Sequence, residues 1–148
     1  MTSADWPAAE TIVTARLILE PLRVNHAAEM AQALDDERLH EYIGGRPATL
    51  EQLQERYARQ VVGRSADGAQ GWLNRIVAEL AWVIAAPQQG KGYASEAAAG
   101  MALWVLGHGA DVLVAHIHPQ HGSSMGVARR LGLTPTDVMI EGETRWTT

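Results

Sequence analysis

Residues 78–101 constrain the fold most, because they predict a strand, a glycine-containing loop and a helix in immediate succession. The apolar run 80–86 ends at Pro87 and is typical of a strand that is buried on both faces. From Ala94 onward, small and apolar residues recur at three- and four-residue spacing, which predicts a helix that ends near Gly107. A strand that leads through a short loop into a helix is half of a parallel crossover unit, so we expect a mixed α/β fold.

The loop between this strand and helix contains Gly90 and Gly92, which allow the backbone to turn sharply and bring its N–H groups to the start of the helix. These N–H groups lack internal partners, and the helix dipole adds about half a positive charge, so we expect an anion site, most often for phosphate. A nucleoside-triphosphate loop does not fit, because Lys91 is followed by glycine rather than by Ser or Thr. A dinucleotide fingerprint is an alternative, but it needs an acidic residue at the end of the next strand, and Asp111 precedes that strand.

The loop sequence 89–94, Gln-Gly-Lys-Gly-Tyr-Ala, resembles the Gln/Arg-x-x-Gly-x-Gly/Ala pyrophosphate loop of the GNAT superfamily of acetyl-CoA-dependent N-acetyltransferases. Segments 14–19 and 119–133 resemble the opening strand and the later strand-to-helix segment of its ribosomal-protein-alanine acetyltransferase branch. The resemblance covers roughly residues 14–146. It implies a GNAT-like central sheet that is mixed but mostly antiparallel, with one parallel splayed strand pair and helices on both faces.

The length of 148 residues predicts a single domain, which we place at residues 14–148 after a flexible N-terminal extension, 1–13. A net charge of -5 argues against a nucleic-acid surface. The absence of cysteine excludes disulfides, thiolate metal sites and cysteine nucleophiles. No apolar run is long enough to cross a membrane, and the first residues lack the pattern of a signal peptide, so we expect a cytoplasmic protein.

Local patterns predict further elements along the chain. We expect a helix capped by Asn25, and a second helix opened by a Thr49–Gln52 capping box with Leu50 and Val61 on its inner face. Strands are predicted near 17–19, 72–77 and 112–117, a helix from about 122 to Gly132, and a hairpin whose turn is 141–143.

One departure from the family lies between the strand at 72–77 and the strand at 80–86. Residues 72–84 span at most about 45 Å when extended, which is too short for the three strands and turns that relatives place there. Either one hairpin is missing, or a segment has been lost from the sequence. A shortened sheet could expose an edge that pairs with a second copy, so we keep a homodimer open.

The resemblance implies acetyl-CoA as the acyl donor. Backbone N–H groups of the loop would hold its pyrophosphate, and the edge of the preceding strand would pair with the pantetheine arm. His121 stands where relatives usually have an asparagine that touches the cofactor. The expected cofactor contacts are therefore Val83, Ile84, Ala85, Gln89, Gly90, Lys91, Gly92, Tyr93, Ala94 and His121.

Acetyl transfer to an amine also requires a base and a proton donor. Glu79 is the best-placed carboxylate, on the strand that leads into the loop, although a strand-end pair with Arg75 is an alternative role. Ser124 matches the serine of the branch and could donate a hydrogen bond to the departing thiolate, whereas Ala128 occupies the position at which many relatives carry a tyrosine.

The histidines at positions 116, 118 and 121 raise two further readings. His116 and His118 share one strand face and could serve as a base near neutral pH. The three histidines together suggest a zinc site, because zinc accepts imidazole ligands. No carboxylate or cysteine completes the ligand set nearby, so we expect no metal.

The acceptor pocket is implied by the family to lie at the loop after the first helix. This places Glu41, Tyr42 and Arg46 near the acceptor. We therefore predict an enzyme that moves the acetyl group directly to a primary amine of a small molecule or of a protein N-terminus. The alternative is a non-catalytic acyl-CoA-binding or sensor domain on the same scaffold.

Overall fold

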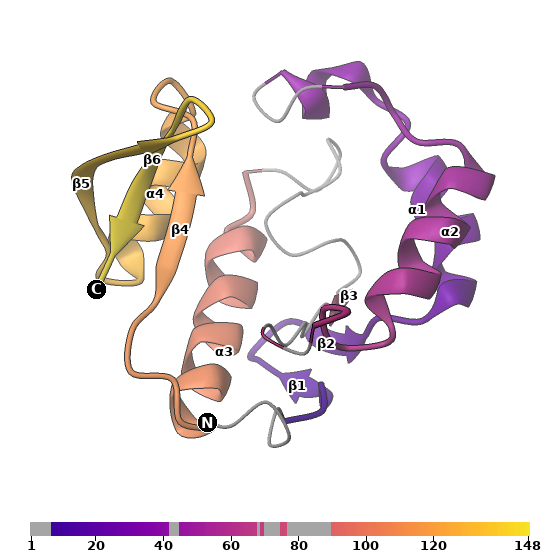
Figure 1. The fold of residues 1–148 in the computed structure, drawn as a ribbon, viewed down its shortest axis with the longest axis horizontal. Coiled ribbons are helices and arrows are strands. Elements are labelled where there is room, and N and C mark those ends of the chain that lie inside the picture. Colours follow the sequence, from indigo (N-terminus) through magenta and orange to yellow (C-terminus); the bar gives the residue numbers. More distant parts are fainter. Residues whose placement is uncertain (1–6, 42–44, 68, 70–74, 77–89) are drawn as a thin grey trace.

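The structure is a computed structural model, and it describes residues 7–41, 45–67, 69, 75–76 and 90–148. Four α-helices, two short 3₁₀ helices and six strands lie within these residues (Figure 1). In chain order, the elements are β1 (Ile12–Val13), β2 (Ile18–Pro21), η1 (Val24–His26), α1 (Ala27–Ala33), η2 (Glu37–His40), α2 (Leu50–Gln60), β3 (Arg75–Ile76), α3 (Tyr93–Gly107), β4 (Val114–Ile117), α4 (Gly122–Arg130), β5 (Thr134–Ile140) and β6 (Glu143–Thr147).

The strands form two three-stranded sheets, in the orders β1-β2-β3 and β4-β6-β5. Every pairing between described strands is antiparallel. The expected parallel splayed pair is not seen among the described strands, and it stays a prediction. The first strand of that pair, 80–86, lies outside the described residues, and β4 pairs antiparallel with β6. The second strand also starts at Val114, later than the expected start at residue 112.

Side chains alternate between buried and exposed positions from Leu17 into β2. Leu17 and Leu19 are buried, whereas Ile18 between them is 56% exposed, as the alternation predicted. β1 pairs with β2 through Ile12 opposite Leu19, so paired backbone begins before residue 14, where we expected the domain to start. The flexible character of the preceding residues stays a prediction.

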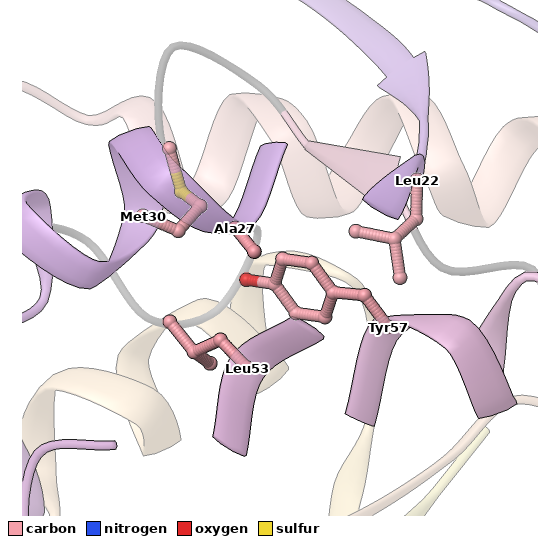
Figure 2. Packing of buried hydrophobic residues seen from close by; sticks show 5 residues of the cluster. All are labelled: Leu22, Ala27, Met30, Leu53 and Tyr57. Carbon is pink, nitrogen blue, oxygen red and sulfur yellow. The ribbon is translucent and has the colours of Figure 1, made fainter. Parts of the chain in front are cut away.

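Helices α1 and α2 pack against each other around a cluster of buried residues (Figure 2). The Tyr57 ring lies between Leu22 and Leu53, and its hydroxyl points toward Ala27. The predicted capping box is confirmed, because Gln52 N–H donates to Thr49 Oγ1 (3.2 Å) and Thr49 N–H donates to Gln52 Oε1 (3.0 Å). It sets the start of α2 and thereby directs one face of the helix toward α1.

Three details of these helices differ from prediction. Asn25 does not cap α1, because it lies inside η1, where Arg23 N–H instead donates to His26 Nδ1 (3.0 Å). Leu50 and Val61 are 42% and 43% exposed, because they occupy the two ends of α2 and only its middle turns face α1.

The C-terminal sheet packs one face on α4. Ile117 and Trp146 are each 2% exposed and contact Ala128 and Leu133 in a second cluster. The predicted hairpin is confirmed: Ile140 pairs with Glu143 across the turn residues Glu141 and Gly142, which both have positive φ. Two positive φ angles match the twist of the flanking strands, which explains glycine in this turn.

Helix α3 lies between these two halves (Figure 1). Ala97 is fully buried and packs against Leu17 and Leu19 of the N-terminal sheet, while α3 also contacts α4. Small side chains on α3 permit this close approach on both sides. The N-termini of α3 and α4 and the carboxyl end of β4 point toward the same end of the molecule in Figure 1, which is where the candidate site lies.

Candidate functional site

The glycine loop has the backbone shape that the sequence predicts. Gly90 and Gly92 have φ angles of 78° and 79°, in the left-handed region that favours glycine. Gly92 is the residue before α3, and having no side chain it leaves the first turn of the helix without a side-chain cap. The first intrahelical bond runs from Glu96 N–H to the carbonyl of Gly92 (3.1 Å). The N–H groups before Glu96 are therefore available to an anion, as the loop sequence indicates.

Arg16 joins this loop to the N-terminal sheet. Its Nη1 donates to the carbonyl oxygen of Lys91 (2.8 Å), and its Nε donates to Glu96 Oε2 (2.6 Å). The guanidinium also lies over the Tyr93 ring, 4.9 Å from the ring centroid. One side chain thus contacts the loop, the first residue of α3 and a carboxylate one turn further along the helix.

Glu96 collects three hydrogen bonds from the segment before β2. Its Oε1 accepts from Thr14 Oγ1 (2.6 Å) and from the backbone N–H of Arg16 (2.7 Å), in addition to the ion pair at Oε2. Hydrogen bonds from the Thr14 and Arg16 side chains hold the pKa of Glu96 below its ordinary value. The carboxylate therefore stays ionised at neutral pH while it remains tied to the N-terminal segment.

A second arginine reaches the first turn of α3 from the other side. Arg130, the last residue of α4, donates from Nη1 to Ser95 Oγ (2.7 Å). Lys91 is exposed in the loop, with its Nζ 6.0 Å from the Tyr93 ring centroid. Three cationic side chains thus surround the start of α3, which favours an anionic ligand there.

The start of α4 brings together two residues that the sequence singled out. Ser124 is 6% exposed, and its Oγ lies 3.0 Å from His121 Nδ1. Burial lowers the pKa of His121, the charge of His118 lowers it further, and Glu41 acts in the opposite direction. The negative charge of Glu41, which comes from the other half of the chain, thus acts on the pKa of His121.

Two further candidate residues occupy exposed positions in the described part of the chain. Arg46 is exposed in the segment before α2, and His116 is exposed on β4. The other predicted site residues lie outside the described part of the chain; they are Tyr42, Glu79, Val83, Ile84, Ala85 and Gln89.

Sequence reasoning missed Arg16 and Glu96 as site residues. Arg16 falls in the segment 14–19 that resembles an opening strand, and Glu96 falls in the helix predicted from Ala94 onward, and neither pattern assigns a site role to them. The two are 80 positions apart, so no local spacing links them. An acidic residue in the first turn of a helix gives no signal by itself, because the helix dipole already stabilises a negative charge there.

No group of three or more potential ligands is arranged to hold a metal ion in the part of the chain that the structure describes. Across those same residues, no helix combines the length and apolar character that crossing a membrane requires.

Comparison with known proteins identifies the family. The model of the acetyltransferase (GNAT) domain matches residues 16–134. No curated protein matches the chain significantly by sequence.

Solved structures share the fold over nearly the whole chain. RimL, a ribosomal L7/L12 alpha-N-protein acetyltransferase in complex with coenzyme A, superposes with a TM-score of 0.76 at 14% identity, covering 94% of this chain and 97% of that chain. RimJ from Mycobacterium smegmatis, in complex with CoA-disulfide, superposes with a TM-score of 0.74 at 15% identity, covering 97% of this chain and 88% of that chain. The microcin C7 self-immunity acetyltransferase MccE, in complex with acetyl-CoA and AMP, superposes with a TM-score of 0.68 at 11% identity, covering 90% of this chain and 92% of that chain.

At these identities the structural likeness establishes the fold alone. The family model, in contrast, spans well over half of the chain and includes both the glycine loop and the Ser124 segment. The chain therefore belongs to the GNAT acetyltransferase family, as the loop sequence and its flanking segments predicted.

Proposed function

We propose that the protein transfers the acetyl group of acetyl-CoA directly to a primary amine of a small molecule or of a protein N-terminus. The observation that carries this proposal is the pair of left-handed glycines before α3, which leaves the first helical turn open to a pyrophosphate. Membership of the acetyltransferase family and the coenzyme A or acetyl-CoA bound by RimL and MccE support the same ligand.

The residues present fit this ligand by their chemistry. The loop offers backbone donors, and Lys91, Arg16 and Arg130 supply positive charge around them. Acetyl-CoA supplies an acyl group that is already activated as a thioester. Holding that group beside an amine accounts for several kcal/mol of barrier reduction, so positioning is the main task of the loop.

We assign proton movement to one carboxylate and one hydroxyl group. We assign Glu79 as the base that removes a proton from the amine. Ser124 donates a hydrogen bond to the departing sulfur, and its hydroxyl lies within 3.0 Å of His121 Nδ1. Glu41, with Tyr42 and Arg46, is assigned to the acceptor side, which is supported for Glu41 by its influence on His121. The acidic charge of the chain, -5, suits a cationic amine.

A non-catalytic acyl-CoA-binding or sensor domain is the second candidate. It is favoured by Ala128, which is fully buried at the position where many family members carry a tyrosine. An alanine methyl group cannot donate a proton, so catalysis here depends on Ser124 or on water.

A panel of amines separates the two candidates. The panel contains peptides with free N-termini, polyamines and aminoglycosides, and coenzyme A release is followed with wild type, Glu79→Gln and Ser124→Ala. We expect turnover with at least one amine, and a loss of kcat of about 10²-fold or more in Glu79→Gln. Glu29→Gln, an exposed position on α1, is the matched control and should be unaffected.

Two results would count against the proposal. Acetyl-CoA binding without turnover on any amine would favour the sensor. Unchanged kcat in Glu79→Gln, with binding intact, would remove the assignment of the base.

A further inference from the structure

The Arg16–Glu96 pair connects three parts of the chain through side-chain and backbone contacts. Arg16 belongs to the segment between β1 and β2, Lys91 belongs to the loop, and Glu96 lies in the first turn of α3. The contacts are a carbonyl bond to Lys91 (2.8 Å), an ion pair with Glu96 (2.6 Å), and a backbone bond from Arg16 to the same carboxylate (2.7 Å).

We propose that Arg16 and Glu96 are positioning residues that hold the 90–92 loop in its ligand-binding shape. This inference rests on the proposed function, because it concerns the loop that binds acetyl-CoA there. Neither residue needs to touch the ligand for the effect.

The bond to Lys91 carries the geometric part of the argument. In a trans peptide the carbonyl group and the following N–H point in opposite directions. Because the Lys91 carbonyl points at the Arg16 guanidinium, the N–H of Gly92 is directed away from Arg16. The orientation of this peptide is set by the ψ angle of Lys91 and the φ angle of Gly92, and glycine at position 92 restricts that φ angle little. Arg16 therefore selects the orientation that presents a donor.

The space around Gly92 supports the same reading. A Cβ atom added at Gly92 would lie 3.3 Å from Arg16 Nη2, so the guanidinium packs directly against this part of the loop. At Gly90, which has nearly the same φ, an added Cβ would meet nothing within 4 Å. The guanidinium thus contacts one glycine of the pair closely.

Glu96 explains why an arginine is required. A carboxylate in the first turn of α3 would repel an anion bound at the same helix terminus. The pKa of Glu96 is lowered, so the group keeps its charge, and the ion pair with Arg16 neutralises it. Lysine could supply the charge, but its single ammonium cannot reproduce the planar fork that spans Glu96 and the Lys91 carbonyl.

The test compares acetyl-CoA affinity with fold stability in the full-length protein. Calorimetry gives the Kd for acetyl-CoA, and thermal unfolding gives the Tm, for Arg16→Gln, Arg16→Lys and Glu96→Gln. The control is Arg23→Gln, which breaks an exposed ion pair with Glu20 (3.1 Å) and lies just after β2. We expect Kd to rise about tenfold or more in Arg16→Gln and Arg16→Lys, because a charge-assisted contact is lost, and to stay within twofold in the control. The rise should be smaller in Glu96→Gln, which loses the same contact but also removes a negative charge beside the bound anion.

Charge and geometry are separated by Arg16→Lys. If the pair positions the loop, this variant keeps the neutralising charge and still loses most of the affinity, while kcat at saturating acetyl-CoA stays near wild type. Full affinity in Arg16→Lys would overturn the positioning role. A lowered Tm with unchanged Kd would also overturn it, because a merely structural pair behaves in that way.

Failure of the inference is distinguishable from failure of the proposed function. Wild-type protein that binds acetyl-CoA while Glu96→Gln and Arg16→Gln bind equally well contradicts the inference alone. Wild-type protein that does not bind acetyl-CoA contradicts both.

Discussion

Gly100 in α3 offers a sharp test of how the N-terminal segment is packed. Alanine is better than glycine inside a helix by about 1 kcal/mol, so Gly100→Ala should stabilise an isolated helix. In the protein, the added Cβ would lie 2.9 Å from Thr14 Cγ2 and 3.5 Å from Ile12 Cγ2. The first distance is shorter than side chains tolerate, so one of the two groups must move.

Thr14 cannot move without losing contacts. Its hydroxyl donates to Glu96 Oε1 (2.6 Å) and accepts from Leu17 N–H (3.1 Å), so rotating its methyl group away would break both hydrogen bonds. Overpacking of this kind costs about 1–3 kcal/mol. Set against the helix gain, Gly100→Ala should be destabilised by up to about 2 kcal/mol.

Gly126 in α4 is the matched control, because an added Cβ would meet nothing within 4 Å. Gly126→Ala should gain the full ~1 kcal/mol. For a chain of this length each kcal/mol shifts Tm by about 2–4 °C, so the two variants should differ by several degrees. The double variant Gly100→Ala/Thr14→Ser, which removes Cγ2 and keeps the hydroxyl, should recover most of the loss. Equal Tm values for Gly100→Ala and Gly126→Ala would refute the packing described for Thr14.

Two further outcomes concern buried polar groups. Tyr57 is 3% exposed, and its hydroxyl has no hydrogen-bond partner among the described residues. Tyr57→Phe should therefore leave the free energy of unfolding, measured in urea, unchanged or raise it by up to about 1 kcal/mol. A clear loss of stability would mean that the hydroxyl is hydrogen-bonded. Burial lowers the pKa of His121, so the folded protein binds fewer protons than the unfolded chain below the ordinary value of about 6.5, and stability decreases as pH falls from there. Tm measured from pH 7.5 to 5 should therefore fall less steeply in His121→Asn than in wild type, and equal slopes would contradict this.

Local sequence patterns predicted the features that depend on a few neighbouring residues. The glycines before α3, the Thr49–Gln52 capping box and the hairpin at 141–143 all follow from backbone preferences within four or five positions. The strand alternation at Leu17 and Leu19 is of the same kind. Such signals do not require knowledge of distant segments.

Features that depend on distant segments were not predictable in this way. Leu50 and Val61 fit a helical stripe, but the partner helix α1 covers only the middle of α2, so both remain exposed. Asn25 is a good capping residue, yet a 3₁₀ turn with His26 accepting from Arg23 takes its place. The Arg16–Glu96 pair joins segments 80 positions apart, and only the folded structure brings them together.

The central claim is that the glycine loop binds acetyl-CoA for transfer to an amine. The most direct measurement is calorimetric titration of acetyl-CoA into wild-type protein and into Gly92→Glu, which places a bulky anionic side chain at a left-handed position where the pyrophosphate would bind. We expect saturable binding of acetyl-CoA to wild type and none to Gly92→Glu, with Glu29→Gln binding as wild type does. Absence of binding to wild type, or equal binding to Gly92→Glu, would contradict it.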